Sequence, residues 1–232
     1  MDTPSNPIRV RRLGRVPYLP TLEAMREFTR ERDGASLDEI WLLEHPPVFT
    51  QGFAGQAGFV RDPGSIPLVA TERGGQATYH GPGQLVAYLL VDLRRRRLGV
   101  RGFVEAVERA LIDYLGSAGI AAGRRERAAG VYLADTDAAS GPKIASIGLK
   151  ISHGRSYHGL ALNVAMDLEP FGRIDPCGMP GLVMTDMRSQ GVSRSVADAG
   201  EELAARLISR LGAEPATTSA TMSSSRFPQA EP

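Results

Sequence analysis

The stretch KIASIGLKISHGRSYHGLALNVAM, residues 143–166, decides the fold class of this chain. It holds two apolar runs, Lys143–Ile151 and Tyr157–Met166, whose length and composition are typical of β-strands. Between them, His153-Gly154 supplies residues that suit a tight turn. The stretch therefore predicts a β-hairpin.

Further extended segments precede this hairpin. Short apolar runs bounded by Gly, Pro or polar residues predict strands at Ile8–Leu13, Glu39–Glu44, Val48–Gln51, Ile66–Thr71, Thr78–His80, Gln84–Leu93 and Val131–Leu133. Gly52–Gly64 is polar and rich in glycine, so we expect a loop there.

Three segments carry apolar residues at helical spacing: Leu19–Arg32, Val100–Ser117 and Ser195–Leu211. Ser195 is suited to cap the last of these helices. Because strands come in runs with helices between some of them, the sequence predicts an α+β domain with a mixed β-sheet and flanking helices.

Composition limits the classes of protein to consider. The 232 residues include 27 Lys and Arg against 26 Asp and Glu, a net charge of +1 that gives no overall attraction to nucleic acid or to an anionic membrane. No apolar run approaches the ~20 residues that span a bilayer, and the first residues lack a secretory signal's apolar core. One cysteine excludes an internal disulfide. We expect a soluble cytoplasmic protein, a monomer by default.

The domain organisation is simple. Residues 1–7 are polar and expected to fray, and residues 213–232 are dominated by Ser, Thr, Ala and Pro, which predicts a disordered tail. A single folded domain is expected over residues 8–212.

Cys177 lies in the segment Asp175–Gly181 (DPCGMPG), among Pro, Gly and Asp. A free cysteine is most often a small buried hydrophobe, but a rigid loop is also a setting for a nucleophilic thiol. Lys143 opens the apolar run KIASIGL. It is either a strand-edge lysine in water or a partly desolvated one, and in the second case it can stabilise a thiolate by charge attraction.

A second segment rich in glycine and in polar side chains is RGGQATYHGPGQ, residues 73–84. Its glycines allow backbone N–H groups to approach a substrate, although a tight connection between strands is the simpler interpretation. No Gly-Lys-Ser/Thr follows, so a phosphate loop is not indicated. His80, His158 and Cys177 show no recognised ligand spacing, and we expect no metal and no cofactor.

Several motifs in one order resemble the lipoyl(octanoyl) transferases, the octanoyltransferases of the lipoate pathway. They are RGG…TYHGPGQLV at 73–86, KIASIGL at 143–149, HGLALNV at 158–164 and PCG at 176–178, with EHPPVFT at 44–50. The resemblance runs from about residue 10 to residue 212. It implies a fold similar to the catalytic domain of biotin and lipoate protein ligases.

The resemblance implies octanoyl transfer from acyl carrier protein to a specific lysine of a lipoyl domain, either of 2-oxoacid dehydrogenase complexes or of glycine cleavage H protein. It assigns Cys177 as the acyl-thioester nucleophile and Lys143 as the residue that activates it. Acyl-chain contacts are expected from Arg73, Gly74, Gly75, Gln76, Ala77, Thr78, Tyr79, His80, Ser146, Ile147, Gly148, Gly159, Leu160 and Ala161.

The assignment also raises the questions of which group acts as base, which donor stabilises the oxyanion and where the carrier protein docks. Lys143 is the first choice as base for the acceptor amine and His80 a weaker one. The backbone N–H of Gly178 is a candidate oxyanion donor. The run Arg94–Arg97 is either a solvated face or a docking site for an acidic carrier protein, and Arg124, Arg125 and Arg127 form a second candidate patch.

Three alternatives stay open. A ligase of the same fold would activate a free acid with ATP and would not need Cys177. An amidotransferase would move octanoyl between two carrier domains. A non-catalytic acyl- or carrier-binding protein would keep the acyl slot without needing Lys143 or Cys177.

Overall fold

The computed structural model describes residues 7–56, 58–126, 128–134 and 141–212. Its α-helices are α1 (Tyr18–Glu31), α2 (Val100–Ser117) and α3 (Val196–Arg210). Ser195 caps α3 by accepting a hydrogen bond from the backbone N–H of Asp198, as the sequence predicts. Two short 3₁₀ helices, η1 (Glu169–Arg173) and η2 (Arg188–Gln190), precede α3.

A seven-stranded mixed sheet forms the centre of the fold, with the strand order β1-β2-β6-β10-β9-β8-β7. Its strands are β1 (Ile8–Arg15), β2 (Asp38–Glu44), β6 (Gln84–Leu90), β7 (Ala122–Arg125), β8 (Ala128–Leu133), β9 (Lys143–Ser152) and β10 (Arg155–Asn163). β1 and β2 are parallel, and the other neighbours in this sheet are antiparallel. The predicted α+β class with a mixed sheet is confirmed.

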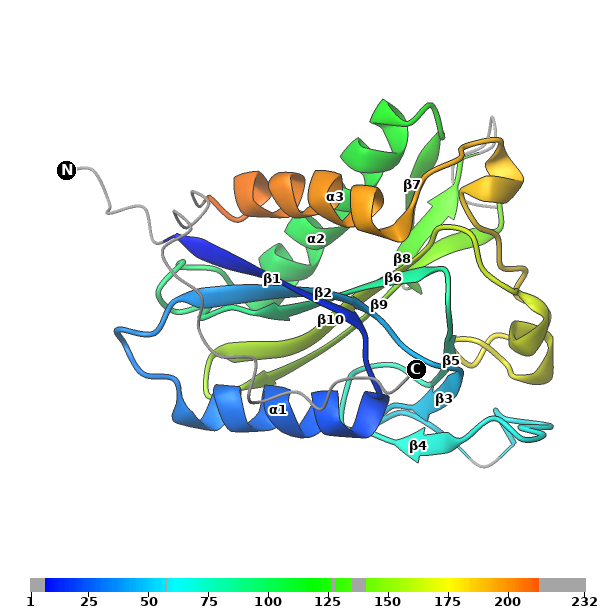
Figure 1. Ribbon diagram of the computed structural model, residues 1–232, viewed down its shortest axis with the longest axis horizontal. Helices are drawn as coiled ribbons and strands as arrows, with labels where there is room; N and C mark the ends of the chain where they lie inside the picture. The colour runs from blue at the N-terminus through cyan, green and yellow to red at the C-terminus, as the bar shows by residue number, and fades with distance from the viewer. Residues whose placement is uncertain (1–6, 57, 127, 135–140, 213–232) are drawn as a thin grey trace.

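A smaller sheet lies beside one end of the large one (Figure 1). It consists of β3 (Val48–Gln51) between β4 (Leu68–Ala70) and β5 (Ala77–His80). Gly83 makes the connection from β5 to β6 possible, because it has a φ of 84° and a Cβ there would lie 2.0 Å from the Ala165 carbonyl oxygen. The Gly-Pro-Gly segment is therefore a tight connection that brings β5 close to the centre of the large sheet.

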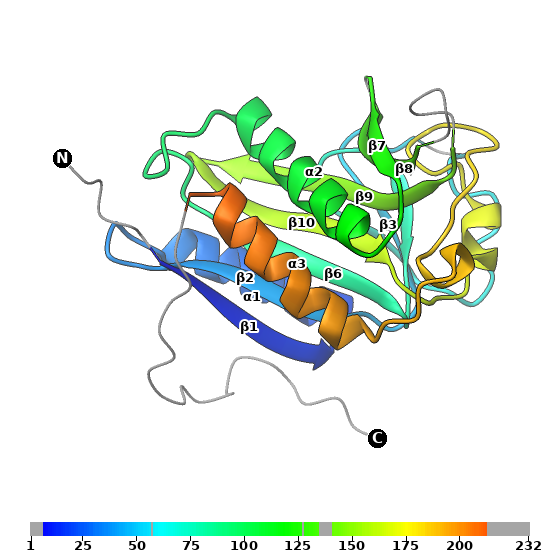
Figure 2. The same cartoon turned by 90° about the horizontal axis from the view of Figure 1, so that it is seen from above.

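The helices cover the large sheet on both faces. α2 and α3 pack on one face and α1 on the other (Figures 1 and 2). Beneath α2 and α3 lies the largest apolar cluster, which includes Phe103, Tyr114 and Leu207. A second cluster joins α1 to the opposite face through Leu22, Met25 and other residues. No helix within the described ranges is long and apolar enough to span a bilayer.

The hairpin predicted from residues 143–166 is present as β9 and β10. Its turn residues His153 and Gly154 have φ values of 51° and 80°, as a two-residue type I′ turn requires. The register pairs Gly159 with Gly148 on one side and with Tyr88 of β6 on the other. The expected contact segments 146–148 and 159–161 therefore lie opposite one another in the middle of the sheet.

Within the run Arg94–Arg97, the two central arginines differ from both interpretations of the sequence. Asp38 is fully buried and accepts hydrogen bonds from Arg95 Nη2 at 2.6 Å and from Arg96 Nε at 2.7 Å. The Arg96 side chain is only 4% exposed. Arg95 and Arg96 are thus neither a solvated face nor a free docking surface, whereas Arg94 and Arg97 are exposed.

Candidate functional site

Lys143 and Cys177, 34 residues apart, meet at one end of a cavity. The Nζ atom of Lys143 lies 3.0 Å from the Sγ atom of Cys177 and donates a second hydrogen bond, of 2.7 Å, to the carbonyl oxygen of Ala129. Lys143 is fully buried. Of the two interpretations of this lysine, the strand-edge lysine in water is wrong.

The backbone around Lys143 is shaped to hold its long side chain. A Cβ at Gly130 would lie 2.6 Å from Lys143 Cε, so a larger residue there would displace the ammonium. On the other side, Nζ lies 5.2 Å from the centre of the Tyr132 ring, a distance at which the ring attracts a cation. The ammonium is therefore confined between β8 and the thiol.

Cys177 sits in a strained loop that other segments hold in place. Its φ is 57°, an uncommon value for a residue with a Cβ, and Gly178 follows with a φ of 64°. Its backbone N–H donates to the Ala77 carbonyl oxygen at 3.3 Å, and Asp175 forms an ion pair with Arg61. Strain of this kind persists where the surroundings enforce it, which is common at functional sites.

The cavity next to this pair runs between β9, β10, β6 and the segment 73–80. Thirteen of the residues expected to contact an acyl chain line it together with Cys177: Arg73, Gly74, Gly75, Gln76, Ala77, Thr78, His80, Ser146, Ile147, Gly148, Gly159, Leu160 and Ala161. Tyr79 lies outside the lining, because its ring packs against Phe49 and Phe171. The sequence interpretation placed Tyr79 with the others because it treated 73–80 as one continuous segment.

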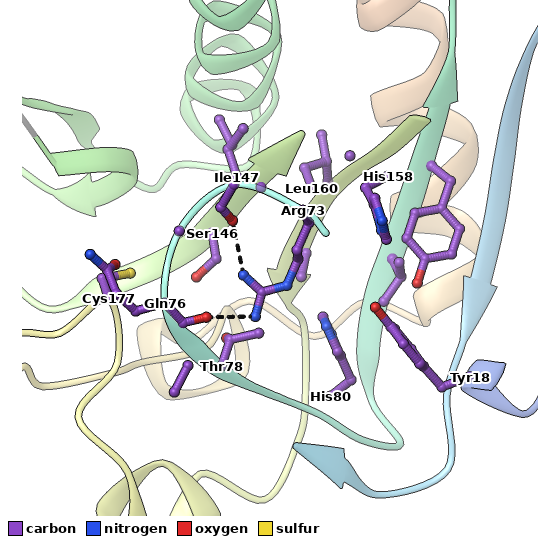
Figure 3. Close-up of a pocket in the computed structure, with 18 residues that line it drawn as sticks. Tyr18, Arg73, Gln76, Thr78, His80, Ser146, Ile147, His158, Leu160 and Cys177 are labelled. Carbon is purple, nitrogen blue, oxygen red and sulfur yellow. Dashed lines mark hydrogen bonds between the residues drawn. The ribbon is translucent and has the colours of Figure 1, made fainter. Parts of the chain in front are cut away.

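Four further residues line the cavity that the sequence interpretation did not include: Tyr18, Val86, Tyr88 and His158. The alternation of side chains along β6 could have indicated two of these lining residues, since Val86 and Tyr88 share one face of that strand. Tyr18 comes from α1, far away in sequence, and no local pattern indicates it. Figure 3 shows Tyr18, His80 and His158 at the end of the cavity away from Cys177.

Arg73 crosses the cavity wall and ties its segments together. The guanidinium donates hydrogen bonds to the carbonyl oxygens of Gly74 and Gln76 (Figure 3) and to that of Thr50. Burial lowers its pKa below the ordinary value. With these donors engaged, Arg73 fixes the loop that carries Gln76 and is not a free anion-binding group.

Three buried histidines surround the far end of the cavity. Burial lowers the pKa of His45 to about 4 and those of His80 and His158 to about 3. His45 Nδ1 donates to the Val16 carbonyl oxygen at 2.7 Å and its Nε2 accepts from the Tyr88 hydroxyl at 2.8 Å. All three rings are therefore neutral at neutral pH, and His80 and His158 line the cavity.

His80 and Gly178 do not fit the roles considered for them. His80 Nδ1 is hydrogen-bonded to Gln84 Oε1 at 2.7 Å, at the opposite end of the cavity from the thiol (Figure 3). The Gly178 N–H donates to the Asp175 carbonyl oxygen at 3.0 Å. Among the described residues, no group of three or more His, Cys, Asp or Glu side chains is arranged to hold a metal ion.

Comparisons with known proteins show the family and the fold. The family described as lipoyl protein ligase A/B catalytic domain matches residues 17–208. An octanoyltransferase of Ectopseudomonas mendocina is 57% identical over 204 residues, which cover 88% of this chain and 97% of that protein. The octanoyltransferase of Marinobacter nauticus is 51% identical over 203 residues, covering 88% of this chain and 93% of that protein.

Solved structures share the architecture at low identity. A bipartite lipoate protein ligase from Thermoplasma acidophilum has a TM-score of 0.75 and 14% identity, covering 96% of this chain and 89% of that chain. A biotin protein ligase from Aquifex aeolicus has a TM-score of 0.54 and 9% identity, covering 88% of this chain and 70% of that chain. These likenesses show the fold alone, and the fold that the motifs implied is confirmed.

Family membership rests on the sequence matches. They cover the whole site, from Tyr18 on α1 through Lys143 to Cys177. The chain therefore belongs to the lipoyl protein ligase A/B catalytic-domain family, where it stands with the octanoyltransferases, which are acyltransferases.

Proposed function

We propose that this chain transfers an octanoyl group from acyl carrier protein to a lysine of a lipoyl domain through a thioester on Cys177. The observation that carries the proposal is the 3.0 Å contact between Lys143 Nζ and Cys177 Sγ at the end of a cavity with apolar walls. The octanoyl group is taken from the names of the relatives. Because the donor is already a thioester, no ATP is required.

The first half-reaction exchanges one thioester for another. The Cys177 thiolate adds to the carbonyl carbon of the donor, and the bond from that carbon to the carrier's sulfur then breaks. The leaving carrier thiolate takes a proton from the Lys143 ammonium. The products are the free carrier thiol, octanoyl-Cys177 and a neutral Lys143.

The second half-reaction restores both side chains. The uncharged amine of the acceptor lysine adds to the acyl carbon, an amide bond forms and the bond to Cys177 Sγ breaks. Lys143 takes the proton that the amine releases, and Cys177 leaves as a thiolate. One lysine thus moves one proton out and back in each cycle.

The cavity supplies binding energy for the hydrocarbon tail. Val86, Ile147, Leu160 and Ala161 contribute apolar wall between the thiol and the aromatic far end. At about 0.8 kcal/mol per buried CH₂, an octanoyl tail gains several kcal/mol. Neutral histidines at the far end are consistent with an uncharged ligand.

The acceptors are proposed from the same family relationship. Lipoyl domains of 2-oxoacid dehydrogenase complexes and glycine cleavage H protein present a lysine that such a transferase modifies. The Thermoplasma acidophilum lipoate protein ligase of this fold belongs to a lipoylation system that includes an E2 lipoyl domain. Transfer between two carrier domains uses the same groups and differs only in the donor.

The deciding experiment follows octanoyl transfer to a lipoyl domain without ATP. We expect octanoyl-acyl carrier protein to support transfer by the wild-type protein and Cys177→Ala to abolish it. Transfer that needs ATP and survives Cys177→Ala would identify a ligase instead. Binding of the donor with no product under either condition would identify a non-catalytic carrier-binding protein.

A further inference from the structure

We propose that the side-chain amide of Gln76 donates a hydrogen bond to the oxyanion formed when Cys177 adds to the thioester carbonyl. This rests on the proposed acyl transfer, in which a tetrahedral oxyanion arises in both half-reactions. A donor placed at that oxygen stabilises the transition state more than the ground state. The question is which donor beside the thiol is available.

The backbone next to the nucleophile offers none. Pro176 has no N–H. The N–H groups of Cys177, Gly178 and Met179 donate to the carbonyl oxygens of Ala77, Asp175 and Pro176, at 3.3, 3.0 and 3.1 Å. These bonds hold the strained loop in shape, so recruiting one of them would cost the loop a support. Because these three N–H groups are engaged, we look for the donor among the side chains that line the cavity.

Lys143 is a poor candidate for the oxyanion donor, because most of its N–H groups already donate hydrogen bonds. Two of its three N–H donors point to the Ala129 carbonyl oxygen and to Cys177 Sγ. In the proposed cycle it also loses a proton when the carrier thiol leaves. A group that changes its charge during the cycle is poorly suited to hold both oxyanions.

Gln76 has the position and the free amide. It lines the same cavity as Cys177, and its Cγ and Cδ atoms would lie 3.4 Å from a Cβ on Gly178. Figure 3 shows its side chain beside the thiol. Within the described part of the chain, the amide group of this side chain makes no hydrogen bond.

The backbone of Gln76 is held firmly while its side chain is free. Its carbonyl oxygen accepts hydrogen bonds from Arg73 Nη2 and from the Gly52 N–H, each at 2.9 Å. With its backbone fixed, only the side-chain torsions of Gln76 must settle when charge develops, which limits the reorganisation that oxyanion stabilisation requires. Arg73 is in this sense a positioning residue for Gln76.

Ser146 is the competing donor. Its hydroxyl lines the cavity and makes no hydrogen bond to any described residue. Ser146 pairs with Ala161 in the β9–β10 ladder, in the wall where the acyl tail would run. The Gln76 side chain instead lies where a Cβ on Gly178, the residue after the nucleophile, would meet it, and we therefore favour Gln76.

The test separates a reaction that forms an oxyanion from one that does not. Gln76→Met keeps the length and packing of the side chain and removes the donor. Acylation of Cys177 by a small octanoyl thioester should slow by about 100-fold. Alkylation of Cys177 by iodoacetamide, a displacement without an oxyanion, should stay within about twofold of wild type, since it needs only the thiolate.

Gln56→Met makes the same chemical change at an exposed loop glutamine and should leave both rates near wild type. The proposal is overturned if Gln76→Met acylates at the wild-type rate, if both of its reactions slow equally, or if Ser146→Ala carries the loss instead. Wild-type protein that forms no octanoyl adduct at all would overturn the proposed function as well. Acylation of wild type and Gln76→Met at equal rates would overturn only the role of Gln76.

Discussion

Gly159 and Ala161, both on β10, differ in whether they can be enlarged without disrupting the sheet. A Cβ at Gly159 would lie 1.9 Å from the Ala87 carbonyl oxygen, so glycine is required there by the contact between β10 and β6. Enlarging Gly159 would therefore disrupt the sheet before it could shorten an acyl slot. Ala161, two residues further along β10, lines the cavity and already carries a side chain.

Depth of the acyl slot is best tested at Ala161. We predict that Ala161→Leu shifts the preferred chain from octanoyl to a shorter acyl group, because the added carbons occupy space that the tail would fill. Each methylene excluded should lower kcat/KM by about fourfold, the equivalent of ~0.8 kcal/mol. The measurement is kcat/KM for a series of thioesters from butanoyl to decanoyl.

The dependence of the kcat/KM loss on acyl-chain length distinguishes a shortened acyl slot from a general loss of activity. An equal loss for every chain length would place the acyl tail elsewhere. Iodoacetamide alkylation of Cys177 serves as the control for an intact thiol, since it needs no acyl slot.

At the level of the elements, the turn after β6 is held by charge. Asp38, at the start of β2, accepts hydrogen bonds from Arg95 and Arg96 and from the Asp92 N–H. Arg95 also donates to the carbonyl oxygens of Gly34 and Ser36. These bonds join the α1–β2 and β6–α2 connections at the end of the sheet remote from the site.

Removing Arg96, which pairs with the buried Asp38 carboxylate, should lower the stability of the fold. We predict that Arg96→Met lowers the free energy of unfolding by about 3 kcal/mol, because it leaves the Asp38 carboxylate buried with less compensation. Arg94→Met, at an exposed position of the same turn, should change it by less than about 0.5 kcal/mol. Urea denaturation of both variants provides the comparison, and equal stabilities would show that the contact between Arg96 and Asp38 contributes nothing to stability.

Elements formed by local patterns were predictable, and pairings between distant segments were not. The helix over Val100–Ser117 is found with the predicted bounds, and the 143–166 hairpin was also evident, because periodicity and a turn signal suffice for both. β7 was missed because Ala122–Arg125 has no apolar alternation. β6 ends at Leu90, earlier than predicted, because the turn that begins at Asp92 follows.

The same limit applies to the site. Cys177 and Lys143 stood out as unusual residues in their segments, yet nothing in the sequence alone gives the 3.0 Å between their side chains. That contact depends on the strained 175–181 loop reaching β9, where the Lys143 N–H donates to the Val183 carbonyl oxygen at 2.9 Å. The family resemblance supplied the pairing, and the tertiary structure supplies its reason.

For the whole molecule, the buried histidines make stability depend on pH. In the folded protein the pKa values of His45, His80 and His158 are about 4, 3 and 3, below the ~6.5 of an unfolded chain. The unfolded state therefore binds more protons between these limits. Their contribution to the free energy of unfolding is present above pH 6.5 and is lost as pH falls to about 4 for His45 and to about 3 for His80 and His158.

We predict that the free energy of unfolding falls by up to ~1.4 kcal/mol per pH unit for each of these histidines below pH 6. Burial opposes the shift at Glu72, but hydrogen bonds from Arg26 lower its pKa to about 2, so this carboxylate adds to the loss only below pH 4.5. His80→Gln should remove about one third of the slope between pH 6 and pH 5. Urea denaturation at several pH values measures the slope, and an unchanged slope would mean that folding does not lower the pKa of His80.

The central claim is that Cys177 carries the acyl group between two carriers. Its most direct test isolates the protein after reaction with octanoyl-acyl carrier protein, locates the adduct by peptide mass spectrometry, and then adds a lipoyl domain without further donor. The account predicts one octanoyl group on Cys177 that passes to the acceptor lysine within a single turnover. An adduct on another residue, or one on Cys177 that stays there while product forms from fresh donor, would contradict it.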